Sequence, residues 1–75
     1  MTRERAREIL RRVWVDGVSI TAEQWAELDG LPGETAFERC MGAAGIPGWE
    51  SVMALAWPER TREVEWRLKR AEVKP

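Results

Sequence analysis

The chain has 75 residues, one cysteine, no histidine and a formal net charge of −1. A lone cysteine excludes an internal disulfide, and the missing histidines exclude zinc fingers and histidine-based acid–base catalysis. A chain this short buries only about 60% of its unfolded surface, so we expect one domain, residues 1–75, stabilised by large apolar side chains or by a partner.

The first predicted element is a helix over residues 3–15. Its apolar residues recur at the spacing of one helical face, and they are Ala6, Ile9, Leu10, Val13 and Trp14. Thr2 is suited to cap its start. Asp16 and Gly17 end it, because glycine readily adopts the left-handed conformation found after a helix C-terminus.

Two short helices, predicted over residues 22–28 and 34–44, form the centre of the chain. Thr21 with Gln24 predicts a capping box at the first, and Thr35 with Glu38 offers another at the second. The apolar faces of the pair consist of Ala22, Trp25, Ala26 and Leu28, then Ala36, Phe37, Cys40, Met41 and Ala44. Gly45 is expected to cap the second helix, and the rest of the chain to cover both faces.

Two further helices are predicted over residues 49–56 and 58–71. On the first, Trp49, Val52, Met53, Ala56 and Trp57 share one side. Pro58 favours a helix start, because proline inside a helix costs about 3 kcal/mol but is tolerated at the first helical position. The alternative is one kinked helix from Trp49 onward, since the apolar stripe nearly continues. The sequence therefore predicts an all-α bundle of four to five short helices.

Trp66 does not fit the apolar face of the last helix. That face carries Val64, Leu68 and Ala71, and Trp66 lies about 200° around the helix from Val64. An exposed tryptophan beside basic side chains has the composition of a protein-interface hot spot. We therefore predict partner contacts through Trp66, Arg62, Lys69, Arg70 and Val73. In the alternative, Trp66 packs against a neighbouring helix, like most of the five tryptophans in a small core, or arginine stems cover it.

Charge is unevenly distributed along the chain. Residues 1–15 contain five arginines and two glutamates, residues 16–59 contain eight acids and Arg39 alone, and residues 60–75 contain six bases and three glutamates. The basic ends could attract the acidic middle within one molecule, make head-to-tail contacts, or lie side by side as one positive face.

No catalytic or metal-binding motif is recognisable, and we expect no enzyme, cofactor or metal. The glycines lack the Gly-Lys-Ser/Thr ending of a phosphate-binding loop. Cys40 falls on an apolar helix face, where a small core residue is the expected role. No window approaches the ~20 apolar residues of a membrane span, so we expect no membrane contact and, with a reduced cysteine, a cytoplasmic protein.

Residues 20–41, ITAEQWAELDGLPGETAFERCM, resemble the helix-turn-helix of bacterial and phage DNA-binding proteins. In that resemblance Ala26 is the small residue of the first helix, Gly30 the turn glycine and Leu31 the apolar residue after it. The second helix would then be the DNA reader, with contacts from Arg3, Arg7, Arg11, Thr35 and Arg39. The match departs from the family in its acids, because Glu34 and Glu38 would face DNA where basic side chains are needed.

Two functions remain. The first is a non-enzymatic interaction or assembly module that binds another protein or its own copies, of a size that fits a small phage-type protein. The alternative is a small helix-turn-helix DNA-binding regulator, in which the flanking arginine-rich helices contact phosphates.

Overall fold

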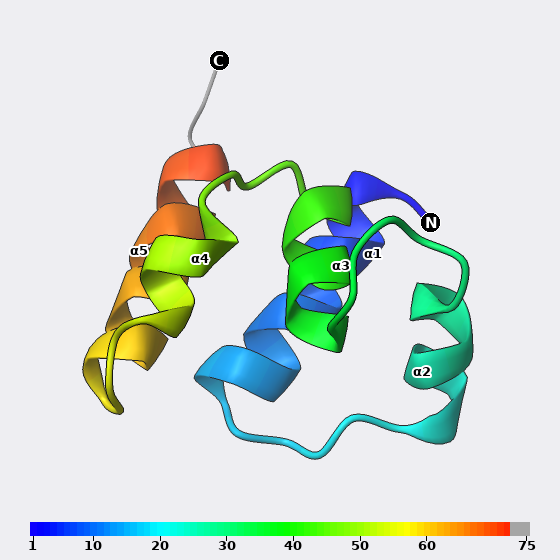
Figure 1. Ribbon diagram of the computed structural model, residues 1–75, viewed down its shortest axis with the longest axis horizontal. Coiled ribbons are helices and arrows are strands. Elements are labelled where there is room, and N and C mark those ends of the chain that lie inside the picture. Colours follow the sequence, from blue (N-terminus) through cyan, green and yellow to red (C-terminus); the bar gives the residue numbers. More distant parts are fainter. Residues whose placement is uncertain (73–75) are drawn as a thin grey trace.

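The computed structural model describes residues 1–72, which are α-helical and contain no strand. Its helices, in chain order, are α1 (Arg3–Leu10), α2 (Ala22–Leu28), α3 (Ala36–Ala43), α4 (Trp49–Met53) and α5 (Glu59–Glu72), with a π-helical turn, η1 (Arg11–Val15), continuing α1. The predicted all-α class is confirmed (Figure 1).

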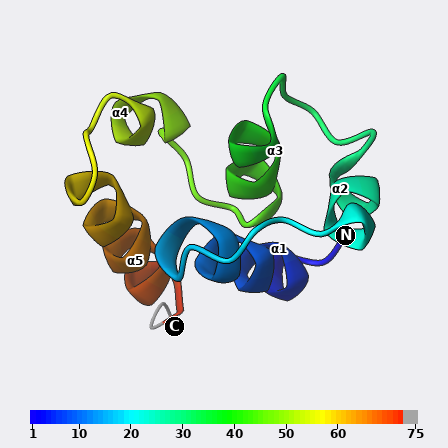
Figure 2. The same cartoon turned by 90° about the horizontal axis from the view of Figure 1, so that it is seen from below.

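Helix α3 occupies the middle of the molecule. It packs against α1, with α2 on one side and α4 on the other, while α5 packs against η1 and α4. Two views at right angles both place α2 and α5 at opposite ends of the longest axis, which extends 31 Å (Figures 1 and 2). The first and last helices of the chain thus meet, and the acidic α2 stands apart from α5.

The core gathers the apolar faces of the helices. Its fully or almost fully buried members are Ala6, Ile9, Leu10, Leu28, Phe37, Cys40, Met41, Ala44, Ile46, Val52, Val64 and Leu68. Burial confirms the inward faces predicted for residues 3–15 and for the last helix at Ala6, Ile9, Leu10, Val64 and Leu68, whereas Val13, Trp14 and Ala71 are partly buried. Residues three or four positions apart lie on the same side of a helix. The spacing of apolar residues in the sequence was therefore sufficient to identify these core residues.

The first helix ends in the π-helical turn η1, which is wider than an α-helical turn. The backbone N–H of Asp16 donates to the carbonyl of Arg11, five residues back, at 2.9 Å. Val13, Trp14 and Val15 in this turn are all partly buried against the core. The ring centroid of Trp14 lies 5.3 Å from that of Phe37 on α3. The turn therefore packs on α3 through Trp14 while α5 packs against it from another side.

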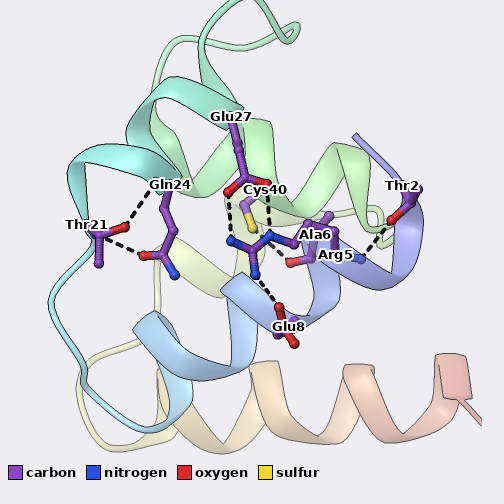
Figure 3. A network of polar contacts seen from close by, with 8 residues as sticks. All are labelled: Thr2, Arg5, Ala6, Glu8, Thr21, Gln24, Glu27 and Cys40. Carbon is purple, nitrogen blue, oxygen red and sulfur yellow. Dashed lines mark hydrogen bonds and ion pairs between the residues drawn. The ribbon is translucent and has the colours of Figure 1, made fainter.

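Most predicted helix ends are confirmed by hydrogen bonds. Thr21 accepts from the N–H of Gln24 at 3.1 Å, and the Gln24 side chain accepts from the N–H of Thr21 at 2.9 Å (Figure 3). This capping box also satisfies Gln24, the buried polar residue of the described chain. Beyond α3, Gly45 adopts φ +75°. The N–H groups of Gly45 and Ile46 then bond back to carbonyls of the last turn, as in a Schellman motif.

The bounds of the three helices predicted over residues 34–44, 49–56 and 58–71 are corrected. The helix expected over residues 34–44 begins at Ala36, because Thr35 is its cap and accepts from the N–H of Glu38. The Glu38 side chain accepts from the N–H of Glu34 rather than from Thr35, so the second capping box is incomplete. The helix expected over residues 58–71 runs from Glu59 to Glu72.

The helix expected over residues 49–56 ends at Met53, so Ala56 and Trp57 are exposed rather than on its apolar side. Arg60 of α5 donates to the carbonyls of Met53 and Leu55 at 2.9 and 3.1 Å, which satisfies the end of α4. The alternative of one kinked helix is wrong, because residues 54–58 separate α4 from α5 and the two helices pack on each other.

The apolar face predicted for residues 22–28 is also corrected. Gln24 and Leu28 form the buried side of α2, whereas Ala22 and Ala26 are exposed and Trp25 is 50% exposed. A helix of seven residues that packs mainly on α3 buries only a narrow side, and Trp25 lies outside it.

Within residues 1–72, no helix has the length and apolar character needed to cross a membrane.

Candidate functional site

A ridge of three side chains runs along α5. Arg62, Trp66 and Arg70 follow one another at a spacing of four, which places them in one row on the helix surface. All three are exposed, Trp66 by 54%. The Arg70 guanidinium lies 4.5 Å from the centroid of the Trp66 ring, a cation–π contact. The predicted exposure of Trp66 is confirmed, and the alternative that it is buried against a neighbouring helix is wrong.

The other predicted partner-binding residues fall near this ridge or outside the structure. Lys69 is exposed on the same helix. Val73 lies outside the described residues 1–72.

Beside the ridge lies a cleft of about 680 Å³, here called the basic cleft. Its walls come from α1, from the link between α3 and α4, and from α5. Its charged lining residues are Arg3, Arg7, Glu63, Arg67 and Arg70, and Trp66 borders it. Four arginines against one glutamate give the cleft a positive potential. The basic ends of the chain therefore come together here, as one of the three charge arrangements expected.

Hydrogen bonds fix the walls of the basic cleft. Arg7 donates from Nε to the carbonyl of Ala44 at 3.0 Å, at the end of α3. Arg67 donates from Nη1 to the carbonyls of Pro47 and Gly48 at 3.0 and 3.2 Å. Its Nε donates to Glu63 at 2.7 Å. These two arginines thus hold the link against α1 and α5, and they position the cleft.

Two other arginines of the cleft differ from Arg7 and Arg67. Within residues 1–72, the side chains of Arg3 and Arg70 make no hydrogen bond or ion pair. Their guanidinium N–H groups are therefore available to an anionic group in the cleft. Arg3 lies close to the link, because a Cβ built on Gly45 would meet its Nε at 2.9 Å.

A second hollow lies on the other side of Trp66. It measures about 480 Å³ and is lined by Leu55, Glu59, Arg62, Glu63 and Trp66. Trp66 therefore stands between two depressions as a projecting, partly apolar element. A partner that covered the ridge would contact both hollows and would remove the indole from water.

The residues predicted to contact nucleic acid do not share one surface. Arg3 and Arg7 line the basic cleft, and Arg7 also lines an adjoining hollow with Arg11, Arg12 and Glu8, so these contacts follow one side of α1. The Thr35 hydroxyl caps α3. Arg39 donates from Nε to the carbonyl of Gly33 at 2.9 Å, so it braces the turn before its own helix.

The central pair also differs in shape from the compact motif that it resembles. Residues 29–35 separate α2 from α3, whereas helix-turn-helix turns have about three or four residues. Gly42 is the one exposed residue of α3, whose other side chains are buried or partly buried. Helix α3 therefore offers few side chains to a groove.

Cys40 is a core residue, as expected. Its thiol is buried and lies 3.1 Å from the carbonyl of Ala6, to which it donates (Figure 3). Burial raises the pKa of the Cys40 thiol to about 12. Within the described residues no three or more His, Cys, Asp or Glu side chains cluster in a way that could hold a metal ion.

Sequence reasoning identified the ridge but missed the cleft. Trp66 was recognisable because it breaks the helical pattern of its own element. Arg3 and Arg67 line one cleft only through tertiary packing, and the signal for this packing in the sequence was no more than the positive charge of both chain ends. Comparisons of the chain with protein-family models, with curated proteins and with solved structures find no match.

Proposed function

We propose that this protein is a non-enzymatic protein-binding module whose partner contacts the basic cleft and the ridge of Arg62, Trp66 and Arg70. The observation that carries the proposal is the position of Trp66, which is 54% exposed, stacked by Arg70 and flanked by two hollows. Tryptophan and arginine are the residues most enriched among interface hot spots.

Burial of the Trp66 ring supplies an apolar driving force. A tryptophan side chain offers roughly 200 Å², so covering its exposed half removes about 100 Å² from water and contributes about 2.5 kcal/mol. The four arginines favour a partner whose docking segment is acidic. A segment that combines carboxylates with an apolar or aromatic side chain therefore suits the site best.

The proposed setting is the cytoplasm, where Cys40 stays reduced, and a small phage-type assembly protein is the kind of molecule that we propose. Chain size, the single cysteine and the absence of catalytic motifs in the sequence support this proposal.

The test is a titration of the full chain with a fluorescein-labelled peptide of alternating glutamate and leucine residues, followed by anisotropy. We expect Trp66→Ala to weaken binding about tenfold or more, since a hot spot contributes about 2 kcal/mol or more. Trp57→Ala is the matched control, because Trp57 is 57% exposed and carries Arg60 at 5.6 Å from its ring, yet lies outside the basic cleft. Equal binding by wild type and Trp66→Ala contradicts the proposal.

The second candidate is the small helix-turn-helix DNA-binding regulator. One observation favours it, because the guanidinium groups of the basic cleft also suit phosphates. The exposed acids of α2 and the few exposed side chains of α3 weigh against it. Titration with duplex DNA separates the two candidates: a regulator with several phosphate contacts loses affinity steeply between about 50 and 200 mM salt. An interaction module binds no duplex.

A further inference from the structure

Helix α2 carries a second exposed surface with the opposite charge. It consists of Ala22, Glu23, Trp25, Ala26 and Asp29, all exposed, and is here called the acidic face. Trp25 is 50% exposed, nearly as much as Trp66. The protein therefore exposes two indoles in opposite surroundings, Trp25 among acids and Trp66 among arginines. The proposed function accounts for Trp66 but not for Trp25.

The acidic face has no basic residue near it in sequence. Residues 16–38 contain six acids and neither lysine nor arginine. One of these acids, Glu27, is already paired with Arg5 of α1. The exposed carboxylates of Glu23 and Asp29 make no hydrogen bond or ion pair through their side chains with residues 1–72.

The acidic face and the ridge of Arg62, Trp66 and Arg70 cannot meet within one molecule. Helices α2 and α5 lie at opposite ends of the 31 Å long axis, with α1 and α3 between them (Figures 1 and 2). Complementary surfaces that one molecule cannot bring together can be joined only between molecules. Contact between two different surfaces is a heterologous contact, which forms rings when its rotation closes and filaments when it does not.

The dimensions of the two surfaces also correspond. The ridge from Arg62 to Arg70 spans about 12 Å along its helix, and the seven residues of α2 span about 10 Å. Small residues at Ala22 and Ala26 leave the backbone of α2 free to approach a neighbour closely. Both surfaces therefore present a helical stretch of similar length with one tryptophan, the whole of α2 on one side and part of α5 on the other.

We infer that the protein associates with itself head to tail, with the acidic face of one copy seated on the basic cleft and Trp66 ridge of the next. This inference rests on the proposed function and names the partner as a second copy of the chain. Glu23 and Asp29 supply carboxylates for the guanidinium groups of Arg3 and Arg70, which have no such partner in the single molecule. Trp25 and Trp66 both leave water when the surfaces meet.

The first experiment measures mass by analytical ultracentrifugation over a range of concentrations of the full chain. We expect species larger than the 8.6 kDa monomer, shifting to monomer as salt rises from about 0.05 to 0.5 M, because screening weakens exposed charge pairs. Trp66→Ala and Trp25→Ala are each expected to raise the dissociation constant about tenfold or more, and Trp57→Ala to leave it unchanged. Circular dichroism establishes that each variant is folded.

The second experiment mixes two variants, each of which has lost one surface. One carries Trp66→Ala with Arg70→Glu and lacks a working cleft; the other carries Trp25→Ala with Glu23→Arg and lacks a working acidic face. Each is expected to be monomeric alone. Their mixture is expected to form a dimer of one copy of each that grows no further, because only one intact pair of surfaces remains.

Three outcomes overturn the inference. The wild type could remain monomeric at every concentration, the cleft variant could still associate with itself, or the mixture could form no dimer. A monomeric chain that binds the acidic peptide loses the self-association but keeps the proposed function. Self-association that is unchanged in the Trp66→Ala variant overturns the inference alone. Binding of the acidic peptide that is unchanged in that variant overturns the proposed function as well.

Discussion

Arg5 of α1 donates two hydrogen bonds to the carboxylate of Glu27 of α2, from Nε to Oε1 at 2.8 Å and from Nη2 to Oε2 at 2.7 Å (Figure 3). Arg5 also pairs with Glu8, one turn along its own helix. A bidentate guanidinium–carboxylate contact fixes the relative orientation of the two groups as well as their distance. It ties the basic first helix to the acidic middle of the chain, the intramolecular attraction that the charge pattern allowed.

Glu27→Gln should lower the thermal unfolding midpoint at neutral pH. The hydrogen bonds from Arg5 hold the pKa of the Glu27 carboxyl below its ordinary value of 4.5. A carboxyl whose pKa is lowered by folding stabilises the folded state above its unfolded pKa, and loses that contribution as pH falls through its folded pKa. The difference in midpoint between wild type and Glu27→Gln should therefore be full at pH 7 and shrink as the pH falls below about 4.5.

Glu50→Gln is the control for that measurement, because Glu50 is exposed on α4 without an ion pair within residues 1–72 and lies outside both proposed surfaces. Its effect on the midpoint should be smaller than that of Glu27→Gln at pH 7. A difference for Glu27→Gln that stays constant from pH 7 to acid conditions would show that the carboxylate charge is not what Arg5 binds.

The thiol of Cys40 should resist modification in the folded protein. Burial raises its pKa from 9.0 to about 12, so the thiolate is about a thousandfold scarcer at neutral pH than for a thiol in water. Ellman's reagent should label Cys40 promptly in denaturant and at least about a thousandfold more slowly without it. Equal rates in the two conditions would contradict the buried position.

Trp66 and Leu68 should differ sharply in their effect on stability. Leu68 is fully buried, so Leu68→Ala should lower the free energy of unfolding by about 2–5 kcal/mol. Trp66→Ala removes an exposed ring with one cation–π contact and should cost about 1 kcal/mol or less. Urea denaturation measures both. A loss of several kcal/mol at Trp66, without a change in peptide binding or self-association, would make it a structural residue.

Gly45 and Gly42 should respond to alanine in opposite directions. Gly45 has φ +75°, and an added Cβ would lie 2.9 Å from Nε of Arg3, so Gly45→Ala should destabilise by about 1 kcal/mol or more. Gly42 lies inside α3 with nothing within 4 Å of an added Cβ. Gly42→Ala should therefore stabilise by about 0.5–1 kcal/mol, through higher helix propensity. Thermal unfolding of the two variants decides the comparison.

Helix type and inward face were predictable where they depend on neighbours in sequence. The spacing of Phe37, Cys40, Met41 and Ala44 defines a single side of α3, and that side is buried. Thr21 and Gln24 could be recognised as a capping box because its hydrogen bonds span only three residues.

Features that depend on distant parts of the chain were not predictable in this way. The exposure of Trp25 follows from the small area that α2 buries, which its own sequence does not encode. The end of α4 at Met53 depends on Arg60, which reaches back from the next helix. The basic cleft requires α1 and α5 to meet, and no local pattern specifies which of several oppositely charged or like-charged segments become neighbours.

The π-helical turn at the end of the first helix has a consequence for how the chain tolerates insertion and deletion. A turn closed over five residues holds one more residue than an ordinary α-turn. Deletion of one residue there is expected to restore ordinary α-helical hydrogen-bond spacing. Helix α1 would keep the same face toward α3. We expect the change to fall mainly on Val13, Trp14 and Val15, which are partly buried against the core, so this turn is where the first helix is expected to accommodate a deletion.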